Sequence, residues 1–443
     1  MADYKYTPAD FKSDQEVRWC PGCGDHAILS AVQRALPEIA DALDTPHNLF
    51  TFVSGIGCSS RFIYYMKTYG FHSVHGRANA VATGVKTANP RLSVWVTTGD
   101  GDSLAIGGNH FIHAIRRNVD LNVILFNNEI YGLTKGQYSP TSKLGKITKT
   151  SPYGTVEKPF NPGELVIGAK GTFFARTIDM EVALSKECMI AAARHTGMSV
   201  IEALQNCVIF NDKTHADFAA DKATRAERTV TLRHGEKMLF GANNEKGIVF
   251  ENMKLKVVTV GQDGYTLDDV LTHDAHERDT TLHSMLAAMK YPDYPVALGV
   301  IRSVEDDSVY DRAVEKQVEE VKATSKIHCV DDLLRSGATW EVEEPRSREA
   351  GIRTTKRRTP GKGPPFVSAG GRGFGRREGF RQEGGVSAGG GNPPRNRESI
   401  DIGRFADDIL QQALHIGDHR TASHAVCRTL PLHLRPLSSV VAA

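Results

Sequence analysis

The sequence has no long hydrophobic run and almost no net charge. No stretch of its 443 residues approaches the roughly 18 apolar residues that a membrane span requires, so we expect no membrane partner. The polar segment 1–19 lacks the apolar core of a secretion signal, which favours a cytoplasmic location. The formal net charge is +2, which gives no indication of a nucleic-acid-binding protein.

The cysteines do not form an obvious disulfide framework. Their number is odd, and the chain has no secretion signal. The seven are Cys20, Cys23, Cys58, Cys188, Cys207, Cys329 and Cys427. In a reducing compartment, clustered cysteines are more often ligands of a metal or cofactor.

The first half of the chain alternates strand and helix signals. Its composition, 40% hydrophobic and 24% charged, is that of a soluble globular protein. Apolar, β-branched runs predict strands at 93–98, 122–126 and 199–203, with helices at 105–118 and 180–195. This alternation predicts an α/β fold with a doubly wound, mostly parallel sheet.

Four segments are expected along the chain: an N-terminal arm (1–16), a cofactor domain (17–212), a C-terminal part of the subunit (213–342) and an extension (343–443). Within the third we expect strands at 255–260, 295–301 and 337–342, and helices at 266–291 and 330–335.

The extension is rich in Gly, Arg and Pro and cannot bury enough apolar surface to offset its chain entropy. We expect it to be mostly disordered, with a weak amphipathic helix near 409–414. Gly-Gly-Arg patches can bind RNA, but an extension without a catalytic role is the favoured interpretation.

A GDGD segment at 99–102 follows one predicted strand, and Asn128 follows the next. Parallel neighbours joined by a right-handed crossover bring their carboxyl ends to the same edge of the sheet. Asp100, Asn128 and a following backbone carbonyl are oxygen ligands suited to Mg²⁺. Gly99 and Gly101 permit a close approach to a diphosphate. A simple tight turn is the competing interpretation.

Cys20 and Cys23 form a Cys-x₂-Cys pair, and Cys58 and Cys207 complete a possible quartet. Four thiolates can bind zinc or a [4Fe–4S] cluster, and their spacing does not choose between these. A redox pair is a further alternative. Cys188 lies in an apolar helical run typical of core packing, and the two remaining cysteines are assigned no role.

An ordered set of motifs resembles the β subunit of 2-oxoacid:ferredoxin oxidoreductases, most closely the 2-oxoglutarate type. The set comprises 20–24 (CPGCG), 55–60 (GIGCSS), 75–84 (HGRANAVATG), 99–102 (GDGD), 113–118 (HAIRRN), 127–137 (NNEIYGLTKGQ) and 138–141 (YSPT). The resemblance covers residues 15–342 and does not reach into the extension.

The resemblance implies three cofactors. A [4Fe–4S] cluster would be held by Cys20, Cys23, Cys58 and Cys207. Mg²⁺ would be held by Asp100, Asn128 and the carbonyl of Ile130. Thiamine diphosphate would contact Ile56, Gly57, Cys58, Ser59, His75, Gly101, Asp102, Gly132 and Leu133.

Two residues are expected to have catalytic roles. His75 on its own is more typical of a satisfied, partly buried histidine, but the family places this histidine near the diphosphate. Lys135 on its own is more typical of a solvated surface residue. It resembles a family lysine directed at the distal carboxylate of 2-oxoglutarate. Arg61 and Arg77 are weaker candidates for anion contacts.

The activity implied by the resemblance is coenzyme-A-dependent oxidative decarboxylation of 2-oxoglutarate to succinyl-CoA, or the reverse carboxylation, with one-electron transfer to ferredoxin. Pyruvate or another 2-oxoacid is the alternative substrate. No carboxylic side chain can be assigned to the aminopyrimidine ring, and in this family an α subunit supplies it. A non-oxidative thiamine lyase and a zinc-stabilised RNA-binding scaffold are the rival functions.

Overall fold

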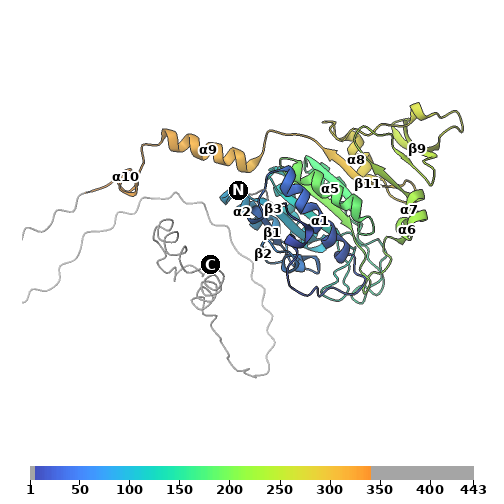
Figure 1. Ribbon diagram of the computed structural model, residues 1–443, viewed down its shortest axis with the longest axis horizontal. Coiled ribbons are helices and arrows are strands. Elements are labelled where there is room, and N and C mark those ends of the chain that lie inside the picture. Colours follow the sequence, from blue (N-terminus) through green and yellow to red (C-terminus); the bar gives the residue numbers. More distant parts are fainter. Residues whose placement is uncertain (1–4, 341–443) are drawn as a thin grey trace, which may run out of the picture. The chain divides into compact units, whose positions relative to one another are not determined.

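The computed structural model describes residues 5–340. Its centre is one eight-stranded sheet with the order β2-β1-β3-β4-β6-β5-β11-β7 (Figure 1). The strands are β1 (Phe50–Ser54), β2 (Tyr69–His72), β3 (Ser93–Gly99), β4 (Asn122–Asn127), β5 (Phe173–Ile178), β6 (Ser199–Leu204), β7 (Thr229–Leu232) and β11 (Val296–Ser303). Every neighbouring pair is parallel except β5 and β11. The predicted mostly parallel α/β fold is confirmed.

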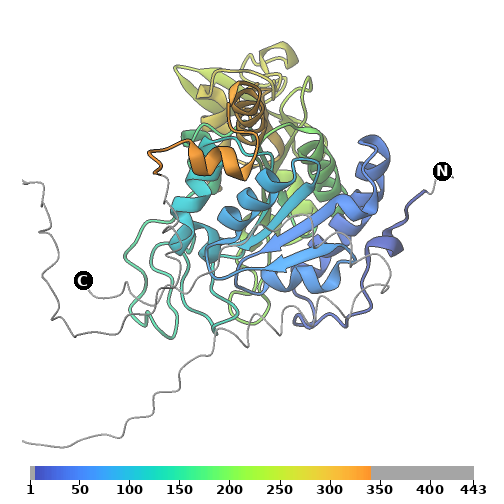
Figure 2. The ribbon, with the colours of Figure 1, turned by 90° about the vertical axis from the view of Figure 1, so that its left-hand side faces the viewer.

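Helices cover both faces of this sheet (Figures 1 and 2). The helices of the described chain are α1 (Asp25–Ala42), α2 (Ala78–Ala88), α3 (Gly108–Arg116), α4 (Pro162–Gly168), α5 (Val182–Arg194), α6 (Ala216–Ala219), α7 (Lys222–Arg228), α8 (Thr281–Ala288), α9 (Tyr310–Thr324) and α10 (Val330–Arg335). The last two, α9 and α10, extend away from the sheet in Figure 1. A π-helical turn (Asp102–Ile106) precedes α3, and a 3₁₀ helix (Ser59–Tyr65) follows β1.

Alternate residues of the central strands enter two separate apolar layers. In β4, Ile124 and Phe126 pack in the layer that contains α1 and α5. Val123 and Leu125 pack in the opposite layer, which contains α2, α3 and α4. Because both faces of the sheet are buried, its central strands are continuous apolar runs, and such runs can be predicted from the sequence.

The segment after residue 212 contributes to the same sheet through β7 and β11. It also forms a small antiparallel sheet of β8 (Leu239–Phe240), β9 (Lys246–Glu251) and β10 (Lys254–Thr259). The strands predicted at 255–260 and 295–301 and the helix at 330–335 are therefore confirmed.

The helix predicted at 266–291 is wrong over most of its length. Only a 3₁₀ turn at Leu267–Asp269 and α8 form there. The backbone between them bonds instead to the segment around β8 and β9, where Leu271 N–H donates to Ile248 O at 2.9 Å and His273 N–H donates to Glu236 O at 2.9 Å. Tertiary hydrogen bonds thus replace the local helical ones.

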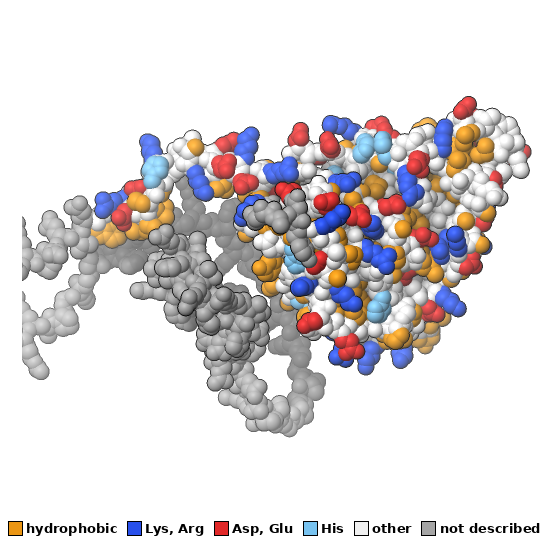
Figure 3. All heavy atoms as spheres, viewed as in Figure 1, with side chains coloured by type: hydrophobic (Ala, Val, Ile, Leu, Met, Phe, Trp, Pro, Cys, Tyr) orange, Lys and Arg blue, Asp and Glu red, His pale blue; other side chains and the backbone are white. Residues whose placement is uncertain are grey.

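The strand predicted at 337–342 is wrong over residues 337–340, which form none, and 341–342 lie outside the described residues. The predictions for 343–443, including the helix near 409–414, also lie outside them. No helix within 5–340 is long and apolar enough to cross a membrane. Acidic and basic side chains are interspersed over the face shown in Figure 3.

A buried ion pair joins β5 and β6. Arg176 Nε donates to Glu202 Oε2 at 2.6 Å, and the two side chains are 6% and 2% exposed. Arg176 also donates to the carbonyl of Ala287 at 3.1 Å, and Asn127 donates to the second glutamate oxygen at 2.8 Å. This network offsets much of the cost of burying two charges.

Removing one partner of this pair should be strongly destabilising. We expect Arg176→Met to lower the free energy of unfolding by about 3–5 kcal/mol, because Glu202 would stay buried without a countercharge. Arg233→Met is the matched control, since Arg233 pairs with Glu187 on the surface, and it should cost less than about 1 kcal/mol. Urea denaturation measures both, and equal losses would contradict the assignment.

Candidate active site

The ends of β3 and β4 open into a cavity of about 530 Å³. The strands are parallel and pair Gly99 with Phe126, so the segments after them emerge at the same edge. All twelve residues predicted to contact thiamine diphosphate or Mg²⁺ line this cavity: Ile56, Gly57, Cys58, Ser59, His75, Asp100, Gly101, Asp102, Asn128, Ile130, Gly132 and Leu133. The structure therefore brings the predicted set together, and their ligand roles remain predictions.

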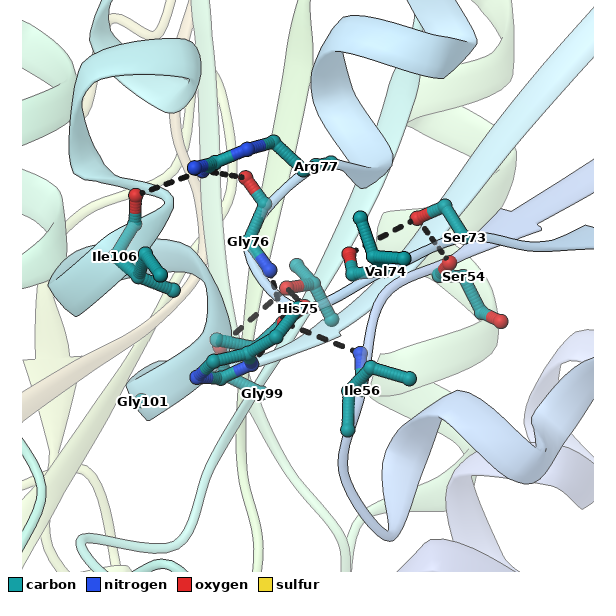
Figure 4. A network of polar contacts seen from close by, with 12 residues as sticks. Ser54, Ile56, Ser73, Val74, His75, Gly76, Arg77, Gly99, Gly101 and Ile106 are labelled. Carbon is teal, nitrogen blue, oxygen red and sulfur yellow. Dashed lines mark hydrogen bonds and ion pairs between the residues drawn. The ribbon is translucent and has the colours of Figure 1, made fainter. Parts of the chain in front are cut away.

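The Asp102 carboxylate is the centre of a hydrogen-bond network at this edge. Figure 4 labels three of its partners, Ile56, His75 and Gly76. One oxygen accepts from the backbone N–H groups of Ile56 and Gly76, at 3.1 and 2.7 Å, and from His75 Nδ1 at 2.7 Å. The other accepts from the Thr98 hydroxyl at 2.6 Å. The contact places a proton on Nδ1 of His75, leaving Nε2 for contacts in the cavity.

Two glycines allow this close packing. A Cβ atom on Gly55 would lie 1.8 Å from an oxygen of Asp102, and one on Gly101 would lie 2.2 Å from the ring of Tyr131. The Tyr131 hydroxyl also donates to the carbonyl of Gly101 at 3.1 Å. Tyr131 was not predicted as a site residue, although it lies within a quoted motif, because its packing partner is 30 residues away.

Asp100 is buried and accepts two hydroxyl hydrogen bonds. Ser139 Oγ and Thr141 Oγ1 donate to Asp100 Oδ2, at 2.6 and 2.5 Å. Burial raises the pKa of Asp100 to about 6, although these hydroxyls and the Gly101 backbone favour the charged form. A carboxylate destabilised in this way gains from a nearby cation.

The Asn-Asn turn after β4 presents the second predicted half of a metal site. Asn128 Oδ1 accepts from the N–H of Ile130 at 3.1 Å, and Asn211 donates to the carbonyl of Asn128 at 2.9 Å. Glu129 has a left-handed backbone, with φ of 55°. Its carboxyl accepts from Thr214 at 2.7 Å, and it is not among the residues lining the cavity.

A second cavity, of about 490 Å³, is lined by Cys20, Cys23, Cys58 and Cys207. Three segments distant in sequence meet here. Trp19 Nε1 donates to the carbonyl of Cys58 at 2.7 Å, and Gly24 N–H donates to the carbonyl of Asn206 at 3.2 Å. The cysteine quartet suggested by the sequence is therefore assembled in the fold.

Two of these thiols, those of Cys23 and Cys58, are partly buried and lie near the negative charge of Asp25, whereas Cys20 is exposed. Burial, Asp25 and the neighbouring thiols raise the pKa of Cys58 to about 12 and raise the pKa of Cys23 as well. Gln205 Nε2 lies 3.3 Å from Cys23 Sγ as a hydrogen-bond donor. Thiolates here would need a positive centre to stabilise them.

The four cysteines of the quartet line one cavity. Within residues 5–340, no group of three or more His, Cys, Asp or Glu side chains is placed to hold one metal ion. A zinc ion touches all four of its ligands directly, whereas each thiolate of a [4Fe–4S] cluster binds a different iron.

The two cavities share a thin wall. Cys58, Asn128, Gly132 and Leu133 line both of them. A Cβ atom on Gly132 would lie 3.5 Å from Cys207 Sγ and 3.6 Å from Cys58 Sγ. Two of the four sulfur atoms therefore lie beside a backbone segment that also borders the first cavity.

The remaining candidate residues do not line the first cavity. Lys135 is exposed in the turn after Gly132 and does not line either cavity. Arg61 lines the cysteine cavity and donates to the Tyr65 hydroxyl at 3.1 Å. Arg77 donates to the carbonyl of Ile106 at 3.2 Å, which is a structural contact. Cys188 is fully buried in α5, as expected for core packing.

Removal of the Asp102 carboxylate should lower the stability of the protein, because several segments at this edge of the sheet bond to it. Asp102→Ala would leave the N–H groups of Ile56 and Gly76 and the ring of His75 without an acceptor. We expect a loss of about 3 kcal/mol or more in unfolding free energy. Asp102→Asn keeps one oxygen for these donors, and the Thr98 hydroxyl can turn to accept. It should therefore lose much less in the same urea titration, and equal losses would show that the network is not the cause.

Comparison with known proteins agrees with this geometry. Residues 55–203 match the family described as thiamine pyrophosphate enzyme, C-terminal TPP binding domain. The 2-oxoglutarate oxidoreductase subunit KorB of Mycobacterium tuberculosis is 46% identical over 337 residues, 75% of this chain and 88% of that protein. Subunit β of 2-oxoacid:ferredoxin oxidoreductase 1 of Aeropyrum pernix is 44% identical over 219 residues, 49% of this chain and 68% of that protein.

A solved structure is also similar. It is a 2-oxoglutarate:ferredoxin oxidoreductase from Magnetococcus marinus with 2-oxoglutarate, coenzyme A and succinyl-CoA bound. The TM-score is 0.59 with 29% sequence identity, and the match covers 75% of this chain and 97% of that one.

Proposed function

This chain belongs to the β-subunit family of 2-oxoacid:ferredoxin oxidoreductases, and from that premise we propose that its substrate is 2-oxoglutarate. With a partner α subunit it would oxidise and decarboxylate 2-oxoglutarate to succinyl-CoA, passing single electrons to ferredoxin. The relatives named for 2-oxoglutarate support this choice of substrate. Pyruvate or another 2-oxoacid is the alternative.

The observation that carries the proposal is the wall shared by the two cavities. A decarboxylase that does not oxidise its product has no use for a cysteine quartet beside its cofactor. Here Cys58 lines both cavities, and Gly132 lies next to two of the four sulfur atoms. An electron acceptor in the cysteine cavity would lie in contact with the wall of the thiamine site.

The residues of the first cavity fit thiamine diphosphate and magnesium. Asp100, Asn128 and the carbonyl of Ile130 would hold Mg²⁺, which prefers oxygen ligands and substrate phosphates. The backbone from Ile56 to Ser59 and at Gly101 would lie along the diphosphate. When bound, thiamine diphosphate supplies the nucleophilic carbon and the electron sink for decarboxylation.

In this scheme the residues of this chain bind and orient the cofactor and the substrate. Asp102 fixes the ring of His75, so that Nε2 can donate to or accept from a bound molecule. Lys135 lies between Thr134 and Gln137, which line the cavity, and would contact the distal carboxylate of the substrate. The cavity's carboxylates are Asp100 and Asp102, and both are engaged by hydroxyl or N–H groups. As the resemblance to the family implies, the carboxyl group facing the aminopyrimidine would come from the α subunit.

Anaerobic co-purification with the α subunit tests the function. The complex should reduce a viologen dye with 2-oxoglutarate only when coenzyme A is present, and more efficiently than with pyruvate or branched-chain 2-oxoacids. The chain alone should be inactive, because the α subunit would supply the carboxyl group that faces the aminopyrimidine. A preference for pyruvate would remove the role of Lys135, and activity of the isolated chain would refute the division of labour.

The cluster has a separate test that does not depend on activity. The complex should contain about four irons and four sulfides per chain. Cys207→Ser should lower both and reduce the visible absorption of the cluster. Cys329→Ser is the matched control, because Cys329 is exposed at the start of α10. Zinc in place of iron, or equal iron in both variants, would rule out the cluster assignment.

Magnesium affinity should depend on pH through Asp100. The pKa of this carboxyl is raised from 3.8 to about 6, so protons compete with Mg²⁺ below that pH. We expect affinity to fall by up to about tenfold per pH unit below 6 and to be constant above 7. The stability of the metal-free protein depends on pH in the opposite direction. Asp100 contributes less to the free energy of unfolding as the pH rises from 3.8 to about 6.

Calorimetric titration of the metal-free complex with Mg²⁺ and thiamine diphosphate measures this dependence. Protonation of the free diphosphate is measured separately and subtracted. An affinity that is unchanged between pH 7 and 5 would contradict the prediction.

A further inference from the structure

We propose that Ser139, Thr141 and Ser142 form a hydroxyl clamp that positions the two halves of the magnesium site. The clamp holds Asp100 on one side and the Asn128–Ile130 turn on the other. The inference rests on the proposed function, since it takes Asp100, Asn128 and Ile130 to be the metal ligands. It adds three positioning residues that are not themselves ligands.

The first side of the clamp fixes the Asp100 carboxylate. Ser139 and Thr141 donate to the same oxygen, Oδ2, at 2.6 and 2.5 Å. All three side chains are nearly inaccessible, with exposures of 3%, 4% and 3% for Ser139, Thr141 and Asp100. Rotation of the carboxylate would break two buried charge-assisted hydrogen bonds at once, so its orientation is set before any metal arrives.

The second side of the clamp holds the turn after β4. Ser142 Oγ donates to the carbonyl of Glu129 at 2.6 Å, and Glu129 stands between Asn128 and Ile130. Ser139 and Ser142 are joined to each other, because Ser139 N–H donates to Ser142 Oγ at 2.8 Å and Ser142 N–H donates to Ser139 O at 3.0 Å. One short turn thus connects the segments after β3 and β4.

The clamp is itself anchored in the sheet. Thr141 Oγ1 lies 2.9 Å from Asn127 Oδ1, and Asn127 donates to Glu202, the partner of Arg176. A hydroxyl has a single proton, so Thr141 can donate to only one of its two acceptors at a time. An ionised Asp100 is the stronger acceptor. Thr141 therefore donates to Asp100 and lies beside Asn127, the last residue of β4, without a second hydrogen bond.

A positioning role and a purely structural role make different predictions. If the hydroxyls served only the packing of a buried turn, their removal would lower stability and leave metal affinity unchanged. If they preorganise the site, their removal should raise the magnesium concentration needed to bind the cofactor. Outer-shell partners of metal ligands typically contribute about 10–100-fold in affinity.

The test uses the αβ complex freed of magnesium and thiamine diphosphate with a chelator. Magnesium is titrated at a fixed concentration of thiamine diphosphate, and binding is followed by calorimetry. Thr141→Val removes the hydroxyl with little change in volume and should weaken magnesium about 10–100-fold. Thr141→Ser restores the hydroxyl and should bind close to the wild-type affinity.

Thr83→Val is the matched control. Thr83 Oγ1 donates at 2.7 Å to the carbonyl of Asn79 within α2, so the same atoms are removed without touching the clamp. Its magnesium affinity should equal that of the wild type. Urea denaturation of each metal-free complex separates losses of stability from losses of affinity.

Wild-type magnesium affinity in Thr141→Val would overturn the clamp. If Thr141→Val does not assemble, Ser142→Ala carries the test. It removes the bond to Glu129 and the acceptor of the Ser139 N–H but keeps both hydroxyl bonds to Asp100, and wild-type affinity in it would equally overturn the proposal. If the unmodified complex binds no thiamine diphosphate, or binds it without magnesium, the proposed function fails rather than the clamp.

Discussion

One buried carboxylate, that of Asp102, holds the cofactor edge of the sheet together. It joins the segment after β1, the loop that carries His75 and the end of β3 through four hydrogen bonds. Burying a charge costs free energy unless donors replace water, and here the four donors come from three separate segments of the chain. Gly55 has no side chain because the carboxylate occupies that space. The positions of the other site residues depend on this arrangement.

The sequence predicts the parts of the site that have local signals. The Asp100 and Asn128 segments follow apolar strands, and the cysteine quartet combines a short motif with two isolated residues, Cys58 and Cys207. The clamp could not be predicted, because Ser139 and Thr141 meet Asp100 across 39 and 41 residues. The helix predicted at 266–291 is wrong for a similar reason, because hydrogen bonds to residues distant in the sequence replace the helical ones.

A few residues that line both cavities fix the position of one cavity relative to the other. Cys58 begins the 3₁₀ helix after β1, and Gly132 lies in the loop after β4. Both strands are neighbours of β3 in a sheet that is buried on both faces. The distance between the cavities is therefore set by the spacing of strands, which is among the least adjustable lengths in a protein.

The position of Cys207 after β6 sets an order of events during synthesis. Strand β6 pairs with both β4 and β5 and completes the centre of the sheet. A nascent chain that has not yet released residue 207 from the ribosome has three of the four thiols and no strand to position the last one. The cysteine cavity can therefore be completed only after residue 207 has left the ribosome, which is later than the translation of the β3 and β4 segments that line the first cavity.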